Sequence, residues 1–184
     1  FYEKFDTNDT RRNTTIISSY VNNKGKKITK TSSPALQGPI PMKYTKPIGE
    51  KGPSFFMDLV VFRYAEVLLS LAEAINEQRG PADAFQYVNQ VRNRAGLTSP
   101  SKVWNITNIP TKEAFRDSIL VERGRELYCE GQRRQDLVRH GKYIQYAIDR
   151  GATGATPGDT LFPIPINVII EGRGIVIQNP GYEN

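Results

Sequence analysis

The chain has 184 residues, a size that fits one domain or a compact domain with an irregular extension. A chain of this length buries roughly 70% of the surface that its unfolded form exposes, so it needs no metal or disulfide to fold. Its single cysteine, Cys129, excludes an intrachain disulfide and a zinc cluster built from thiols, and no apolar run approaches the roughly 20 residues that span a bilayer.

The formal net charge of +6 is concentrated at the N-terminal end. Residues 1–57 carry ten lysines and arginines against four aspartates and glutamates, whereas residues 58–184 carry fifteen of each. A nucleic-acid-binding domain usually gathers positive charge on an ordered face with aromatic or arginine contacts. Here the excess is spread over a segment rich in lysine, threonine and serine, so we expect no nucleic-acid partner. The change in composition divides the chain into an N-terminal segment, 1–57, and a helical region, 58–184.

The N-terminal segment is predicted to form a β-hairpin followed by irregular chain. Residues 8–33 hold β-branched runs on both sides of the sequence NNKGK, a pattern typical of two strands joined by a turn in which Asn23 or Gly25 takes a positive φ. From Pro34 to Pro53, five prolines and three glycines interrupt the sequence, so this stretch is predicted to be extended and irregular.

Residues 58–97 are predicted to form a helical hairpin of the tetratricopeptide type. Gly80 is placed to end the first helix, Pro81 to open the second, and Gly96 to close it. Two helices of this kind bury their apolar stripes against neighbouring helices. The residues that recur at helical spacing are Phe62, Ala65, Leu69, Ala72 and Ile75 or Asn76 in the first helix, and Ala84, Val88, Val91 and Ala95 in the second.

Residues 111–141 are predicted to form a third, longer helix with Thr111 as its N-cap. Projected at 100° per residue, its glutamates and arginines share the face that carries its leucines. Buried charges must be paired and hydrogen-bonded, and the planar guanidinium group binds a carboxylate with two parallel hydrogen bonds. We therefore predict a structural ion-pair network across the interface of the first and third helices, made of Arg63, Glu66, Glu73, Glu122, Arg123, Glu126, Glu130 and Arg133.

The same glutamates admit an enzymatic alternative, because paired carboxylates hydrolyse glycosidic bonds. Catalytic pairs normally flank an open cleft, whereas Glu122, Glu126 and Glu130 are predicted on a leucine-bearing helix face. His140, the only histidine, is interpreted as a solvated residue at a helix end. We assign no catalytic residue and no metal ligand.

The C-terminal residues 151–184 are rich in glycine and proline, which excludes a long helix. The sequences LFPIP (161–165) and IVIQNPGY (175–182) are predicted to be extended. The fold class is therefore mainly α, with a tetratricopeptide-like helical hairpin, a long helix, an N-terminal β-hairpin and extended segments rich in proline and glycine.

Several stretches together resemble the C-terminal part of the SusD/RagB family, whose members are glycan-capturing surface lipoproteins of the Bacteroidetes outer membrane. They are FRYAEVLLSLAEAINE at 62–77, VNQVRNRAGL at 88–97, ILVERGRELYCEGQRRQDLVRHG at 119–141, and LFPIP with QNPGY within 161–182, in the family's order. DTRRNTTI at 9–16 resembles the family's acidic-x-Arg entry strand. Gly124 departs from the pattern, since a larger residue is common there and glycine costs about 1 kcal/mol in a helix interior. Cys129 departs as well, standing where an aromatic or apolar residue is usual.

The resemblance implies a protein longer than this chain, with a signal peptide and a lipidated cysteine upstream of Phe1. It also implies a non-catalytic protein, without a cofactor, on the surface of the outer membrane. Such a protein binds oligosaccharide or polysaccharide and passes it to a TonB-dependent, SusC-like transporter, and it is attached to the membrane only through its lipid anchor.

Ligand residues differ between family members, so the candidates are chosen from physical chemistry alone: an exposed aromatic ring stacks on the face of a sugar. Trp104, in the loop before the third helix, is the first candidate, followed by Tyr20, Tyr44, Tyr143 and Tyr146. The structural alternative for Trp104 is to anchor its loop, because large aromatic side chains bury most of their area. For the protein as a whole, a helical-repeat module that binds a partner protein is the second hypothesis.

Overall fold

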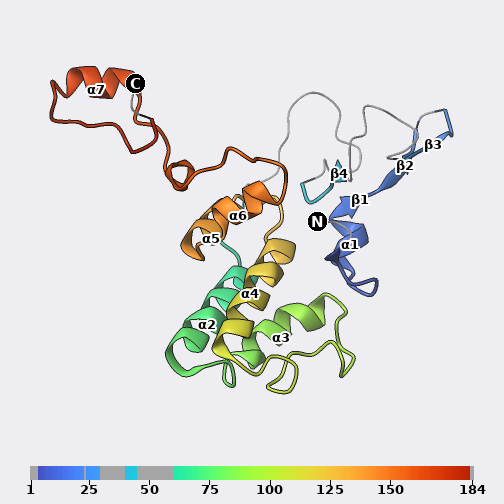
Figure 1. The fold of residues 1–184 in the computed structure, drawn as a ribbon. Coiled ribbons are helices and arrows are strands. Elements are labelled where there is room, and N and C mark those ends of the chain that lie inside the picture. The colour runs from blue at the N-terminus through green and yellow to red at the C-terminus, as the bar shows by residue number, and fades with distance from the viewer. Residues whose placement is uncertain (1–3, 23, 30–39, 45–59, 183–184) are drawn as a thin grey trace. The chain divides into compact units, whose positions relative to one another are not determined.

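The computed structural model describes residues 4–22, 24–29, 40–44 and 60–182 (Figure 1). These residues are mainly α-helical, with short strands in the N-terminal part, as the sequence predicts. The chain divides into two compact units, Phe1–Arg133 and Arg134–Asn184. Within the described ranges, no helix combines the length and the apolar character needed to cross a bilayer.

The elements follow one another along the chain in a simple order. The first unit contains α1 (Arg11–Thr14), β1 (Ile16–Ile17), β2 (Ser19–Val21), β3 (Lys27–Thr29), β4 (Ile40–Pro41), α2 (Tyr64–Arg79), α3 (Phe85–Arg94) and α4 (Lys112–Glu126). After α5 (Arg133–Arg139), the second unit holds α6 (Tyr143–Ile148), the 3-10 helix η2 (Pro157–Thr160) and α7 (Ile166–Glu171).

The predicted hairpin is present as β2 and β3, which pair antiparallel. Gly25 takes φ +72° in its turn, while Asn23 lies outside the described residues, as does most of the stretch from Pro34 to Pro53. Within that stretch, β4 pairs antiparallel with β1.

The DTRRNTTI sequence begins with the helical turn α1 and not with a strand, which corrects the prediction. Asp9 Oδ1 accepts a hydrogen bond from Arg11 N at 3.0 Å. A side-chain bond of this kind, two residues ahead, starts a turn and not a strand.

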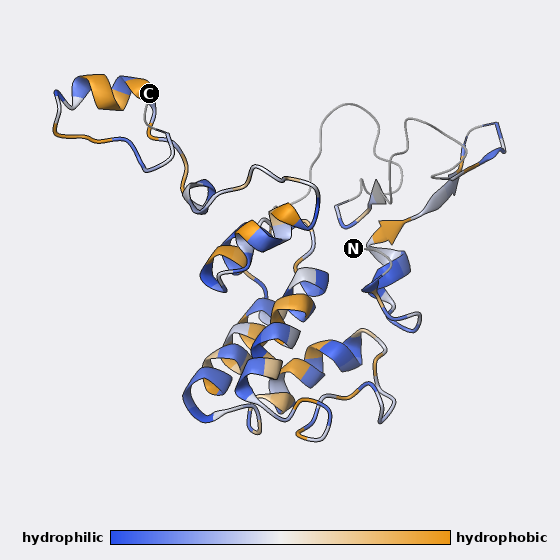
Figure 2. Ribbon diagram, viewed as in Figure 1, coloured by the Kyte–Doolittle hydropathy of each residue, from blue (hydrophilic) through white to orange (hydrophobic). Residues whose placement is uncertain are grey.

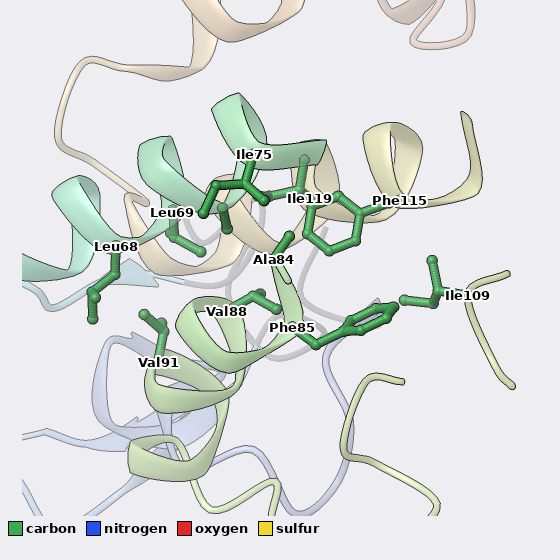
Figure 3. Packing of buried hydrophobic residues seen from close by; sticks show 11 residues of the cluster. Leu68, Leu69, Ile75, Ala84, Phe85, Val88, Val91, Ile109, Phe115 and Ile119 are labelled. Atoms are coloured by element: carbon green, nitrogen blue, oxygen red, sulfur yellow. The ribbon is translucent and has the colours of Figure 1, made fainter. Parts of the chain in front are cut away.

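The core of the first unit lies between α2, α3 and α4, where side chains of the three helices point toward one another (Figure 3). Phe115 of α4 is fully buried, and its ring meets those of Phe85 and Trp104 edge-on, with centroids 5.7 Å apart in each case. The stripe predicted on α2 is buried at Leu69, Ala72, Ile75 and Asn76, and that on α3 at Val88 and Val91. Phe62 is 77% exposed, because it precedes the first residue of α2.

The predicted helix ends agree with the structure in three places. Gly80 (φ +85°) caps α2, and Gly96 (φ +83°) follows α3. A Cβ at Gly96 would approach Asn8 O to 3.1 Å, so both the conformation and the space favour glycine. Thr111 caps α4, with its Oγ1 accepting from Ala114 N at 3.1 Å. In contrast, α3 begins at Phe85 and not at Pro81, because residues 82–84 form a turn.

The single helix predicted for 111–141 is wrong. α4 ends at Glu126 and α5 begins at Arg133, and between them Cys129 (φ +62°) and Gly131 (φ +78°) take left-handed conformations that a helix does not contain. A helical projection therefore does not apply beyond Glu126.

Gly124 has a structural explanation in the same region. A Cβ at this position would lie 2.8 Å from Arg133 Nη1. That nitrogen crosses the helix to donate a hydrogen bond to Leu120 O at 2.6 Å. The missing side chain thus leaves room for an arginine that contacts the backbone of α4.

The second unit joins its two irregular segments through side-chain amides. Gln178 accepts a hydrogen bond from Ile164 N at 2.7 Å and donates one to Ile164 O at 2.9 Å, as a neighbouring strand would. Asn179 donates to Phe162 O at 2.7 Å. The segments predicted as extended, 161–165 and 175–182, contain no helix or strand. The short helix α7 between them was not predicted, and Figure 2 shows it as largely hydrophobic.

Substitution of one buried and one exposed valine tests where the core of the first unit lies. Val88 on α3 is fully buried, whereas Val67 on α2 is 56% exposed. We expect Val88→Ala to lower the free energy of unfolding by roughly 2 kcal/mol, because it removes buried methyl groups and leaves a cavity. The matched change Val67→Ala should cost less than about 0.5 kcal/mol. Urea denaturation measures both, and equal losses would contradict the arrangement of these helices.

Candidate functional site

The C-terminal end of α4 is the meeting point of charged side chains from five parts of the first unit. Glu122 and Glu126 leave α4 on its buried side and are 0% and 3% exposed. Arginines reach them from α1, from the residue before α2 and from α3. An isolated buried carboxylate costs several kcal/mol, so this many partners is what their burial requires.

Glu126 binds three arginines. Its Oε1 accepts from Arg63 Nη1 at 2.5 Å, and its Oε2 accepts from Arg11 Nη1 at 2.9 Å. Arg94 Nη2 lies 2.6 Å from both oxygens. The backbone carbonyl of Glu126, at the negative end of the helix dipole, accepts from Lys43 Nζ and Arg63 Nη2, each at 2.6 Å.

Glu122 binds two arginines that the sequence analysis did not select. Arg11 Nη1 lies 2.8 Å from Glu122 Oε1, and Arg92 Nη1 donates to Oε2 at 2.7 Å. Arg11 is oriented by Asp9, whose two oxygens accept from Arg11 Nε at 2.9 Å and Nη2 at 2.7 Å. This bidentate pair fixes Arg11 in the plane from which it reaches both glutamates.

Glu130 lies outside the helix but belongs to the same network. It accepts from Arg63 Nε at 2.7 Å and forms an ion pair with Lys43. The turn at Cys129 and Gly131, which follows the end of α4, brings Glu130 there and so places a third carboxylate beside Arg63.

The pKa values of these groups reflect the pairing. Burial alone would raise the pKa of Glu126, but hydrogen bonds from Arg63 and Arg11 outweigh it and hold that pKa below its ordinary value. For Glu130, burial again acts to raise the pKa, and hydrogen bonds from Arg63 and Lys43 lower it overall. Both carboxylates are therefore held in the ionised form.

The structure brings together several of the residues predicted for the network. Arg63, Glu122, Glu126 and Glu130 meet at the end of α4. Arg123 donates to Ser70 Oγ of α2 at 3.1 Å, and Arg133 reaches Leu120 O. Glu66 and Glu73 are partly buried on α2. The network also contains residues that were not predicted, although the DTRR and VRNR sequences were two of the stretches that carried the family resemblance: Asp9, Arg11, Lys43, Arg92 and Arg94.

A pocket of about 430 Å³ lies beside the network, between α2 and α3. Ala65, Leu68 and Val91 supply apolar walls, and the lining also includes Tyr64. Tyr64 is 71% exposed. Polar groups come from Arg63, Gln90 and Arg94. Tyr64 was not among the aromatic candidates, although its place at the start of an apolar helix stripe marks it in the sequence.

The predicted sugar-binding aromatics lie in different surroundings. Trp104 packs against the core: its ring contacts Phe115, and the Arg92 guanidinium lies 4.8 Å from the ring centroid. Asn89 also hydrogen-bonds the backbone of Trp104 on both sides, at 2.8 and 2.9 Å. This environment matches the structural alternative, in which Trp104 anchors its loop.

The four tyrosines lie outside the hydrophobic core. Tyr20 is 41% exposed on β2, and Tyr44 lines a cavity at the end of α4. In the second unit, Tyr143 and Tyr146 are partly buried on α6, with the Arg134 guanidinium 5.2 Å from the ring of Tyr143.

The arrangement of charges is suited to a structural role and not to acid–base catalysis. Each of the three glutamates is held by at least two cationic partners and is at most 4% exposed in its side chain. A general acid must instead reach a substrate and hold a proton near neutral pH. Among the described residues, no group of three or more histidine, cysteine, aspartate or glutamate side chains is placed to hold a metal ion.

The comparisons with known proteins agree on one class. A family model described as the SusD family matches residues 1–182. The chain is 33% identical over 172 residues to SusD-like protein P25 of Formosa agariphila, covering 92% of this chain and 30% of that protein. It is 37% identical over 134 residues to the starch-binding protein SusD of Bacteroides thetaiotaomicron, covering 68% and 22% respectively.

Solved structures give the same result. Surface glycan-binding protein A from Bacteroides thetaiotaomicron, in complex with laminarihexaose, matches with a TM-score of 0.72 at 28% identity, over 97% of this chain and 39% of that one. A SusD homolog from the same organism matches with a TM-score of 0.73 at 26% identity, over 95% and 41%. The fold and its charged centre thus define a SusD-like helical scaffold. The chain belongs to the SusD family, which confirms the resemblance found in the sequence.

The pKa directions predict how stability changes with pH. Glu126 and Glu130 have folded-state pKa values below the ordinary 4.5, so the unfolded state takes up their protons first as the pH falls. Their stabilisation is complete above about pH 5 and is lost as the pH falls through the folded pKa values. We expect Glu126→Gln to lower the free energy of unfolding near neutral pH by roughly 3 kcal/mol, because buried Arg11 and Arg63 lose a charged partner. We also expect it to make the loss at acid pH shallower.

Urea denaturation at a series of pH values measures both effects. Glu113→Gln is the control, because Glu113 is an exposed glutamate in the first turn of the same helix. It should cost less than about 1 kcal/mol. A Glu126→Gln profile that overlays the parent profile at every pH would show that the network does not support the fold.

Proposed function

We propose that this protein is a non-catalytic glycan-binding component of an outer-membrane uptake system. In this proposal it sits on the cell surface through a lipid anchor and passes oligosaccharide to a TonB-dependent, SusC-like transporter. The observation that carries the proposal is the match over 97% of the chain to a glycan-binding protein held in complex with laminarihexaose. Family membership and the starch-binding relative support it.

The pocket between α2 and α3 is the proposed place of sugar contact in this chain. Its volume of about 430 Å³ falls in the usual range for ligand sites, roughly 300–1,000 Å³. Tyr64 offers an exposed ring for stacking on a sugar face, and Gln90 and Arg94 offer hydrogen-bond donors for hydroxyl groups. An aromatic surface with a few polar groups is the combination that carbohydrate recognition requires.

The non-enzymatic part of the proposal is supported by the state of the carboxylates. Retaining glycosidases hold two free carboxyl groups about 5 Å apart across an open cleft. Here Glu122 and Glu126 are buried and ion-paired. Both relatives with a stated ligand are named as binding proteins and not as enzymes.

A protein-binding helical repeat is the second candidate function. The observation that favours it is the exposed apolar face of α2, where Val67 and Leu71 are 56% and 40% exposed and Tyr64 is 71% exposed. A partner helix would cover this face, whereas a glycan would occupy only the pocket at its N-terminal end.

Native gels that contain a neutral glucan, such as laminarin or starch, test the proposal. We expect the chain to be retarded, and Tyr64→Ala to weaken the apparent affinity by about tenfold, the loss of one stacking contact of about 1.4 kcal/mol. Phe62→Ala is the matched control, because Phe62 is an aromatic residue 77% exposed, two positions before Tyr64, that does not line the pocket, and it should leave retardation unchanged. Trp104→Ala should lower the melting temperature, because it empties a place beside the core.

Two results would contradict the proposal. One is equal mobility of the chain with and without every glucan tested, which would leave the helical-repeat alternative. The other is release of sugar from laminarihexaose in solution, which would revive the enzymatic one.

A further inference from the structure

A second cavity, of about 260 Å³, opens at the C-terminal end of α4, and half of the residues that line it are cationic. Five of the residues in its wall are basic, and they come from α1, from the segment after β4, from the residue before α2, and from α3 and α4. They are Arg11, Lys43, Arg63, Arg94 and Arg125, against the two carboxylates of Glu126 and Glu130.

The carboxylates do not balance this charge. Among the described residues, six cationic side chains form ion pairs in the network with only four carboxylates. The network therefore has an excess of two positive charges. The cations are Arg11, Lys43, Arg63, Arg92, Arg94 and Arg125, and the carboxylates are Asp9, Glu122, Glu126 and Glu130.

Two of the cavity's cations have pKa values below their ordinary values. Burial is the main cause that lowers the pKa of Lys43, and the nearby charge of Arg63 lowers it further. Burial also lowers the pKa of Arg125, and the charges of Arg11 and Arg92 act in the same direction, against Glu122. The nearest carboxylate oxygen to Arg125 is 3.7 Å away, on Glu122. An added anion would relieve both groups.

Arg94, in the wall of this cavity, has donors that the network does not use. Arg94 has a side chain that is 59% exposed, and among the described residues only its Nη2 is bound, to Glu126. Guanidinium groups with free N–H donors are well suited to bind a carboxylate.

We propose that this cavity binds the carboxylate of an acidic sugar, such as a uronic acid unit of a glycan. The cavity is smaller than most ligand sites, which fits one acidic unit and not a longer oligosaccharide. Tyr44 lies in its wall and offers a ring beside the sugar. The inference rests on the proposed glycan-binding function and names the class of glycan that the chain selects.

Calorimetric titration of the chain at low ionic strength tests the proposal, with sodium glucuronate, glucose and sodium sulfate as the three probes. We expect glucuronate to bind at least tenfold more tightly than glucose, which lacks the charge, and than sulfate, which lacks the ring. Arg94→Gln should weaken glucuronate binding at least tenfold. Arg79→Gln is the matched control, because Arg79 is a helix arginine with a side chain 63% exposed and a distant partner, Asp83, at 3.8 Å.

Each other outcome overturns the proposal. Equal binding of glucuronate and glucose would remove the role of charge, and equal binding of sulfate would reduce the cavity to a site for any small oxyanion. Unchanged affinity in Arg94→Gln, with circular dichroism confirming the fold, would place binding elsewhere. The comparison of probes on the unaltered chain decides the matter even if the variant unfolds. Neutral glucans carry no charge, so the gel experiment with Tyr64→Ala fails or succeeds separately.

Discussion

The burial of two glutamates on α4 is the constraint on which the first unit depends. Glu122 and Glu126 lie where a helix of this kind would otherwise carry leucine, and their charges are tolerable only because arginines from α1, α3 and the start of α2 converge on them. Arg11 lies 115 positions before Glu126 in the sequence, the largest separation among these ion pairs. The N-terminal segment is therefore held to the helices by charge, while the helices are held to one another by the apolar cluster around Phe115.

The local features of the fold were readable because each has a short-range cause. Thr111, Gly80 and Gly96 mark helix ends through a side-chain cap or a positive φ, and the valine and alanine spacing located the buried faces of α2 and α3. The break after α4 was missed because the apolar periodicity of 119–138 continues through it, although Gly131 was a visible stop signal. Arg63 and Glu126 were placed in one network from their helix faces, whereas Arg11 and Arg92 were missed because contacts between residues far apart in the sequence leave no periodic pattern.

The candidate recognition surface consists of cationic side chains that remain partly exposed after the buried glutamates are paired. Once Glu122, Glu126 and Glu130 are neutralised, the arginines left partly exposed, above all Arg94, border both the α2–α3 pocket and the cationic cavity. Sequence reasoning reached the glycan-binding class through family resemblance, yet it looked for the sugar contact at Trp104, whose ring packs against the core. Whether an aromatic side chain is exposed is decided by packing and not by residue type. Recognition in this chain is thus proposed to use side chains that the scaffold orients and leaves partly free.

The most direct test of the central claim is a double-mutant cycle between Arg11 and Glu126. Arg11→Gln, Glu126→Gln and the double variant are compared with the parent by urea denaturation near neutral pH. If Arg11 holds the N-terminal segment by pairing with buried α4 carboxylates, the two changes are non-additive, with a coupling energy of roughly 1.5–3 kcal/mol. Effects that add within about 0.5 kcal/mol would show that the two side chains stabilise the protein independently, and would contradict the account.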